Sequence, residues 1–131
     1  MADAAKGSVL VADDDPAILR LIKTILEKEG HTVITARDGK EAYKALQDHQ
    51  DIIAAVLDVV MPNIDGPELA RYMKSEKRFM HIPVMMMTAE QDPKLSRDSF
   101  AAGAIVFLPK PFTHAQLQTM LRMLIGKGKK S

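Results

Sequence analysis

The sequence contains no cysteine, so disulfide bonds and thiolate metal sites are excluded and nothing requires an oxidising compartment. Its formal net charge is only +1, which disfavours the strongly basic surface of a nucleic-acid-binding protein. No apolar run approaches the roughly 20 residues of a membrane span, and the first residues, MADAAKGS, lack the apolar core of a signal peptide. Neither GxxxxGK[ST] nor GxGxxG occurs, so no nucleotide-binding loop is indicated. These absences predict a cytoplasmic protein without a membrane or nucleic-acid partner.

The chain has enough apolar sequence for one domain. Of its 131 residues, 47% are hydrophobic and 27% are charged, and a domain typically has about 100–200 residues. No repeat, linker or low-complexity segment divides it. We expect a domain over residues 8–126, preceded by an extension at 1–7 and followed by a basic tail at 127–131. The tail is better explained as the solvated end of the last helix than as a tether to nucleic acid or membrane.

Five short segments are rich in apolar residues and carry little charge, as is typical of strands buried on both faces of a parallel sheet. They cover residues 8–12, 32–36, 52–58, 83–89 and 104–108. The intervening segments have helical spacing; between Pro16 and Gly30, apolar residues recur every three or four positions. Strict alternation of the two kinds of segment predicts an α/β fold, a single doubly wound parallel sheet of five strands with helices on both faces.

Helix start and stop signals agree with this division. Asp15 followed by Pro16 is a helix start, and Gly30 is a suitable stop. Residues 38–41 and 113–116 have the pattern of capping boxes. Asp92 and Pro93 open another helix, which Gly103 closes.

Polar side chains follow the predicted strands at the edge where such sheets bind ligands. Each has a simple structural role when taken alone: helix-start acids, a strand-end hydroxyl, a surface lysine. Asp15 is expected to act only as a helix cap. Five further polar residues should converge in the fold, although up to 97 positions separate them in the chain. They are Asp13, Asp14, Asp58, Thr88 and Lys110.

The charges of this group predict a metal site. Asp13, Asp14 and Asp58 would carry three negative charges, which repel one another. A divalent cation and Lys110 would neutralise them. Oxygen ligands without histidine or cysteine suit Mg²⁺. A carboxylate, a lysine and a hydroxyl beside Mg²⁺ are the groups that phosphoryl transfer needs.

The sequence resembles a response-regulator receiver domain of two-component signalling, from about Ser8 to Gly126. The motifs that carry the resemblance are VLVADDDP, VLDVVMPNIDG, IPVMMMTA and FLPKPF, in this order. Together they are highly specific, whereas each alone is weak. The resemblance implies a flavodoxin-like fold with strand order 2-1-3-4-5.

The resemblance also implies a role for each site residue. Asp58 matches the aspartate that a histidine kinase or phosphotransfer protein phosphorylates. The implied Mg²⁺ ligands are Asp14, Asp58 and the backbone carbonyl of Val60, with Asp13 acting largely through water. Lys110 matches the lysine that bonds the phosphoryl group, Thr88 the switch hydroxyl and Phe107 the switch aromatic. The Lys110–Pro111 peptide bond is expected to be cis.

The expected function is that of a single-domain response regulator, which is phosphorylated on Asp58 and switches a protein-binding face at residues 92–126. It is not expected to be an enzyme. Two alternatives are a receiver fragment of a longer regulator and a Mg²⁺-dependent phosphohydrolase with an aspartyl-phosphate intermediate. The second lacks room for a substrate-binding cap domain. A flavin-binding domain is disfavoured because acids stand where a flavin phosphate would bind.

Overall fold

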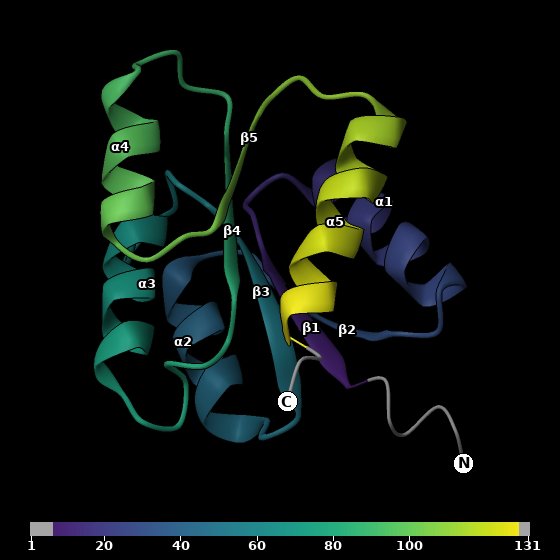
Figure 1. The fold of residues 1–131 in the computed structure, drawn as a ribbon, viewed down its shortest axis with the longest axis horizontal. Coiled ribbons are helices and arrows are strands. Elements are labelled where there is room, and N and C mark those ends of the chain that lie inside the picture. The colour runs from purple at the N-terminus through teal and green to yellow at the C-terminus, as the bar shows by residue number, and fades with distance from the viewer. Residues whose placement is uncertain (1–6, 129–131) are drawn as a thin grey trace.

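The computed structural model describes residues 7–128, in which five strands alternate with five helices (Figure 1). The strands are β1 (Ser8–Ala12), β2 (Thr32–Ala36), β3 (Ile52–Asp58), β4 (Val84–Thr88) and β5 (Val106–Pro109). The helices are α1 (Pro16–Lys28), α2 (Gly39–Asp48), α3 (Gly66–Ser75), α4 (Lys94–Ala101) and α5 (His114–Gly128). Except for Gly7, the predicted N-terminal extension lies outside the described residues. Of the predicted tail, Lys127 and Gly128 continue α5, and residues 129–131 lie outside the described part.

All strand pairs are parallel, and their order is β2-β1-β3-β4-β5. The register brings the carboxyl ends of the strands to one edge, since Ala12 lies opposite Leu57 and Asp58 opposite Met87. Both the doubly wound sheet and the implied strand order are therefore confirmed. At this edge β1 and β3 lead to helices on opposite faces, which is where such sheets place their ligand sites.

The sheet separates two hydrophobic cores, because successive strand side chains point to opposite faces. In β1, Leu10 and Ala12 pack toward α2 and α3, whereas Val9 and Val11 pack toward α1 and α5. Figure 1 shows α2, α3 and α4 on one side of the sheet and α1 and α5 on the other. These cores fix the strands in register and so hold the edge rigid.

The predicted helix ends are largely confirmed. Asp15 caps α1 by accepting a hydrogen bond from the Ala17 N–H, and Gly30 beyond that helix has φ +91°. Thr113 and Gln116 form a reciprocal capping box at α5. At α2 the Asp38 side chain accepts from the Glu41 N–H, but the Glu41 carboxylate accepts from Arg37 rather than from the cap residue itself.

The bounds of two strands, β4 and β5, differ from the prediction. β4 is one residue shorter at each end than 83–89, and Pro83 has no N–H to donate to a ladder. β5 begins at Val106 instead of residue 104, because the Ala104 N–H donates to the Ser99 carbonyl in the turn that ends α4. No helix within residues 7–128 is long and apolar enough to cross a bilayer.

Candidate functional site

The carboxylate of Asp58 lies at the carboxyl edge of the sheet, where β3 ends between β1 and β4. The hydrogen bonding between β3 and β4 continues past Asp58, because the Val59 N–H donates to the Met87 carbonyl at 2.8 Å. Asp58 is only 6% exposed, and Asp13, which follows β1, is completely buried. Asp14 is exposed. Two buried carboxylates on adjacent strands are costly unless other groups stabilise their charge.

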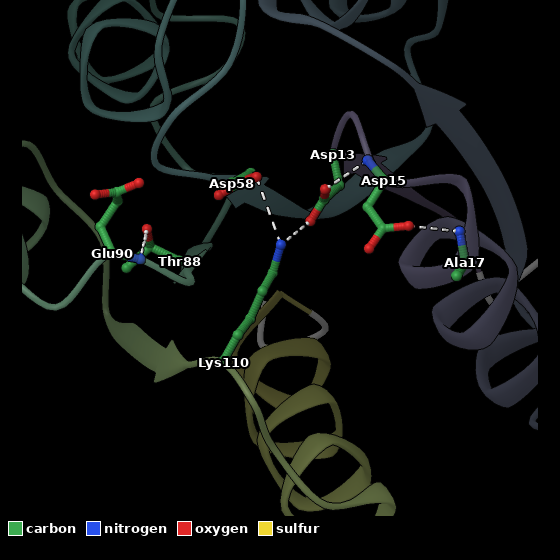
Figure 2. Close-up of polar contacts among 7 residues, drawn as sticks. All are labelled: Asp13, Asp15, Ala17, Asp58, Thr88, Glu90 and Lys110. Atoms are coloured by element: carbon green, nitrogen blue, oxygen red, sulfur yellow. Dashed lines mark hydrogen bonds and ion pairs between the residues drawn. The ribbon is translucent and has the colours of Figure 1, made fainter.

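Lys110 supplies the opposite charge. Its Nζ lies 2.7 Å from Asp13 Oδ2 and 3.5 Å from Asp58 Oδ2, and Figure 2 shows its side chain extending between the two aspartates. The Lys110 backbone N–H donates to the Thr88 carbonyl at 2.7 Å, which anchors the residue beside β4. The Lys110–Pro111 peptide bond is cis, as the resemblance implied.

The surroundings of Asp58 and Lys110 raise the pKa values of both groups. Burial and the nearby carboxylate of Asp13 raise the pKa of Asp58 to about 6, although Lys110 and the Val60 N–H lower it in part. Burial by itself would lower the pKa of Lys110, but the hydrogen bond and charge of Asp13, together with Asp58, outweigh burial and raise that pKa. Lys110 therefore stays charged, while Asp58 holds an ionised carboxylate only at a cost.

A loop of residues 59–65 follows Asp58 and joins β3 to α3, and it presents Val60, which is 51% exposed. The two ends of the loop are joined by a hydrogen bond, which the Gly66 N–H donates to the Val59 carbonyl at 2.9 Å. The Gly39 N–H donates to the Pro62 carbonyl at 3.2 Å.

Two glycines at this loop were not recognised as site residues from the sequence. A Cβ on Gly39 would overlap the carbonyl group of Ile64, and one on Gly66 would lie 2.5 Å from the Asp58 carbonyl oxygen. The sequence marked Gly39 only as part of a capping box, and nothing in that pattern reveals the approach of a distant loop.

The two predicted switch residues lie on the neighbouring strands. Thr88 is buried at the end of β4, and its Oγ1 accepts a hydrogen bond from the Glu90 N–H at 3.1 Å. In Figure 2 the Glu90 carboxylate lies beyond Thr88, away from Lys110. Phe107 in β5 is half-buried, and its ring centroid is 6.3 Å from that of Phe100. The structure thus places Thr88 at the edge and Phe107 one strand further out.

The acidic side chains fit a hard divalent cation. Carboxylate oxygens of Asp13, Asp14 and Asp58 all lie within 4.8 Å of one another. With all three ionised, Lys110 would offset only one of their charges. An oxygen-only donor set with excess negative charge matches the preference of Mg²⁺.

Comparison with known proteins agrees with this geometry. The sequence model of the response regulator receiver domain family matches residues 9–122. A chemotaxis protein CheY homolog of Campylobacter jejuni is 32% identical over 92% of this chain and 93% of its own length. The transcriptional regulatory protein TcrA of Mycobacterium tuberculosis is 37% identical over 92% of this chain but only 46% of its own length.

A solved structure extends the comparison to the acidic cluster. The receiver domain of the sensor histidine kinase PA1611 from Pseudomonas aeruginosa has a TM-score of 0.80 and 26% identity. The alignment covers 92% of this chain and 98% of that domain, which has a magnesium ion coordinated in its active-site cleft. The chain described here belongs to the response regulator receiver domain family of two-component signalling.

Proposed function

We propose that the chain is a stand-alone phosphorylation switch in which Asp58 accepts a phosphoryl group with the help of Mg²⁺. One observation carries the proposal: Asp58 lies at a sheet edge with Lys110 at 3.5 Å and two further carboxylates within metal-ligand reach. The similarity to a CheY homolog over 93% of that protein's length supports a regulator without an output domain. The similarity to half of TcrA supports the alternative, a receiver within a longer protein.

The residues have distinct tasks in this reaction. A carboxylate oxygen of Asp58 attacks phosphorus; the new O–P bond forms as the donor's bond to phosphorus breaks, and the leaving group keeps the electron pair. Lys110 offsets negative charge on the phosphoryl oxygens. Asp13, Asp14, Asp58 and the Val60 carbonyl would hold Mg²⁺, which supplies charge stabilisation to the phosphoryl oxygens and the attacking carboxylate.

We propose that the phosphoryl group is donated by a histidine kinase or a phosphotransfer protein. Thr88 and Phe107 would then bias a pre-existing equilibrium of the face at residues 92–126, which a downstream protein binds. Couplings of this kind are typically about 1–3 kcal/mol, or roughly 5–150-fold in affinity. In this proposal the chain is a phosphoacceptor and not an enzyme. Its cytoplasmic location stays a prediction.

Incubation with acetyl phosphate and Mg²⁺ tests the assignment. Intact mass should show one added phosphoryl group, and EDTA or Asp58→Asn should abolish it. A matched control is Asp48→Asn on α2, whose carboxylate is exposed and paired with Lys44 at 2.7 Å; this variant should label normally. Labelling that persists in Asp58→Asn would refute the site. Catalytic turnover of small phosphate esters would instead favour the phosphohydrolase.

A further inference from the structure

A cavity lies at the opposite edge of the sheet from Asp58, between the end of α2 and the connection from α3 to β4. Figure 1 shows both segments at the edge where β3 begins, whereas the helices that follow the functional site start at the other edge. The cavity has a volume of about 320 Å³, at the lower end of the range for small-molecule sites. Its floor is apolar and buried, and consists of Leu46, Ile52, Phe79 and Ile82.

The guanidinium of Arg78 is held in place beside this floor. Its Nη2 donates a 2.6 Å hydrogen bond to Gln47 Oε1, and Gln47 Nε2 in turn donates to the Tyr72 hydroxyl at 2.8 Å. The central carbon of the guanidinium lies 4.7 Å from the centroid of the Phe79 ring. An arginine fixed by two neighbours loses little further side-chain entropy when it binds an anion.

No carboxylate of residues 7–128 forms an ion pair with Arg78. The acid at the end of α2, Asp48, is engaged by Lys44. The remaining polar lining consists of His49, Gln50 and His81, none of which carries a negative charge. The cavity therefore combines an apolar floor with a fixed cation, and no residue of its lining supplies a negative charge.

We propose that this cavity binds a small organic anion with a flat apolar body and one carboxylate. The apolar body would lie on Leu46, Ile52 and Ile82, and the carboxylate would accept hydrogen bonds from the free guanidinium N–H groups of Arg78. An inorganic anion would leave the floor uncovered, and a neutral aromatic compound would leave Arg78 without its partner. The cavity shares no residue with the phosphorylation site, so this proposal can be tested independently of the proposed function.

Titration with 3-phenylpropionate, monitored by NMR, tests the proposal. The protein has four histidines, and the imidazole signals of His49 and His81 should shift in a saturable manner while that of His114 on α5 does not. Arg78→Gln should weaken binding roughly tenfold or more, as expected for loss of a charge-assisted hydrogen bond. The control Arg71→Gln removes another exposed arginine, which lines the groove between α3 and α4 instead, and should bind normally.

Two further probes identify which feature is recognised. The neutral isostere 3-phenylpropionamide and inorganic phosphate should both bind at least about tenfold more weakly than 3-phenylpropionate. Equal binding of the amide would show that the cation contributes nothing, and equal binding of phosphate would show that the floor contributes nothing; either result overturns the proposal. It is also overturned if Arg78→Gln, folded by its NMR spectrum, binds as tightly as the parent.

Discussion

Lys110 and Asp13 are 97 positions apart in the chain, yet their Nζ and Oδ2 atoms lie 2.7 Å apart, closer than Lys110 approaches Asp58. Asp13 is completely buried, so a lone charge there would be strongly destabilising. In the metal-free site, the positive charge of Lys110 therefore interacts mainly with Asp13. Asp58 is left with a weaker counter-charge, in agreement with its raised pKa.

Mg²⁺ should stabilise the folded protein, because it relieves the repulsion among Asp13, Asp14 and Asp58. At a hundred times the dissociation constant the gain is about 2.7 kcal/mol. Asp14→Asn should weaken Mg²⁺ binding and raise the melting temperature of the metal-free protein. Thermal unfolding with EDTA and with millimolar Mg²⁺ measures both effects. If Mg²⁺ leaves the melting temperature unchanged, the acidic cluster is not a metal site.

The raised pKa of Asp58 predicts how metal-free stability depends on pH. Burial and Asp13 raise this pKa from its ordinary 3.8 to about 6, so the folded protein binds the proton more tightly than the unfolded chain does. The stabilisation that results is complete below about pH 4 and is lost as the pH rises through about 6. Asp58→Asn, which never ionises, should therefore unfold at a higher temperature than the parent in EDTA at about pH 7.5.

That advantage should shrink toward zero as the pH falls to about 3, below the ordinary pKa of 3.8, where Asp58 is mostly protonated in both folded and unfolded parent chains. Melting temperatures of the two proteins across this range give the comparison. A difference that is the same at both ends of the range would contradict the raised pKa.

Gly39→Ala should disturb the functional site from a distance. The added methyl group would overlap the Ile64 carbonyl, so the loop at 59–65 must move and carry Val60 with it. We expect a loss of about 1–3 kcal/mol in the free energy of unfolding, together with slower phosphorylation by acetyl phosphate.

Gly126→Ala in α5 is the matched control, since nothing lies within 4 Å of its added Cβ. It should raise the free energy of unfolding by roughly 0.5–1 kcal/mol and leave the phosphorylation rate unchanged. Equal phosphorylation rates in Gly39→Ala and the parent would show that Gly39 does not position the loop.

The lifetime of phospho-Asp58 should depend on Val60. Water must approach phosphorus in line with the bond that breaks, and Val60 adds exposed apolar bulk beside Asp58 without a group to orient that water. Glu90 carries such a group, but Figure 2 shows its carboxylate on the far side of Thr88 from Lys110. We expect slow self-dephosphorylation, and Val60→Asn should shorten the half-life severalfold at constant Mg²⁺. An unchanged or longer half-life would count against this role.

Local sequence patterns were sufficient to predict the helices and strands and most of the residues at which they begin and end. Asp15 and Pro16 start α1 because capping and a fixed φ act within a few residues, and these interactions do not depend on the rest of the fold. The start of β5 was wrong by two residues, because a hydrogen bond to Ser99 in the preceding helix decides it. Sheet order came from the family resemblance, since continuous apolar strands have no preferred neighbour in their own sequence.

By itself the sequence determined which residues would form the acidic edge, because parallel strands that alternate with helices must all end on the same side of the sheet. Only the tertiary structure decided that Lys110 pairs more closely with Asp13 than with Asp58, and that Gly39 leaves room for the loop that carries Val60. The tertiary structure also decided that Arg78, His49 and His81 surround one cavity. These relationships depend on distances between segments far apart in the chain, which are set by the packing of two cores against one sheet and not by any local pattern.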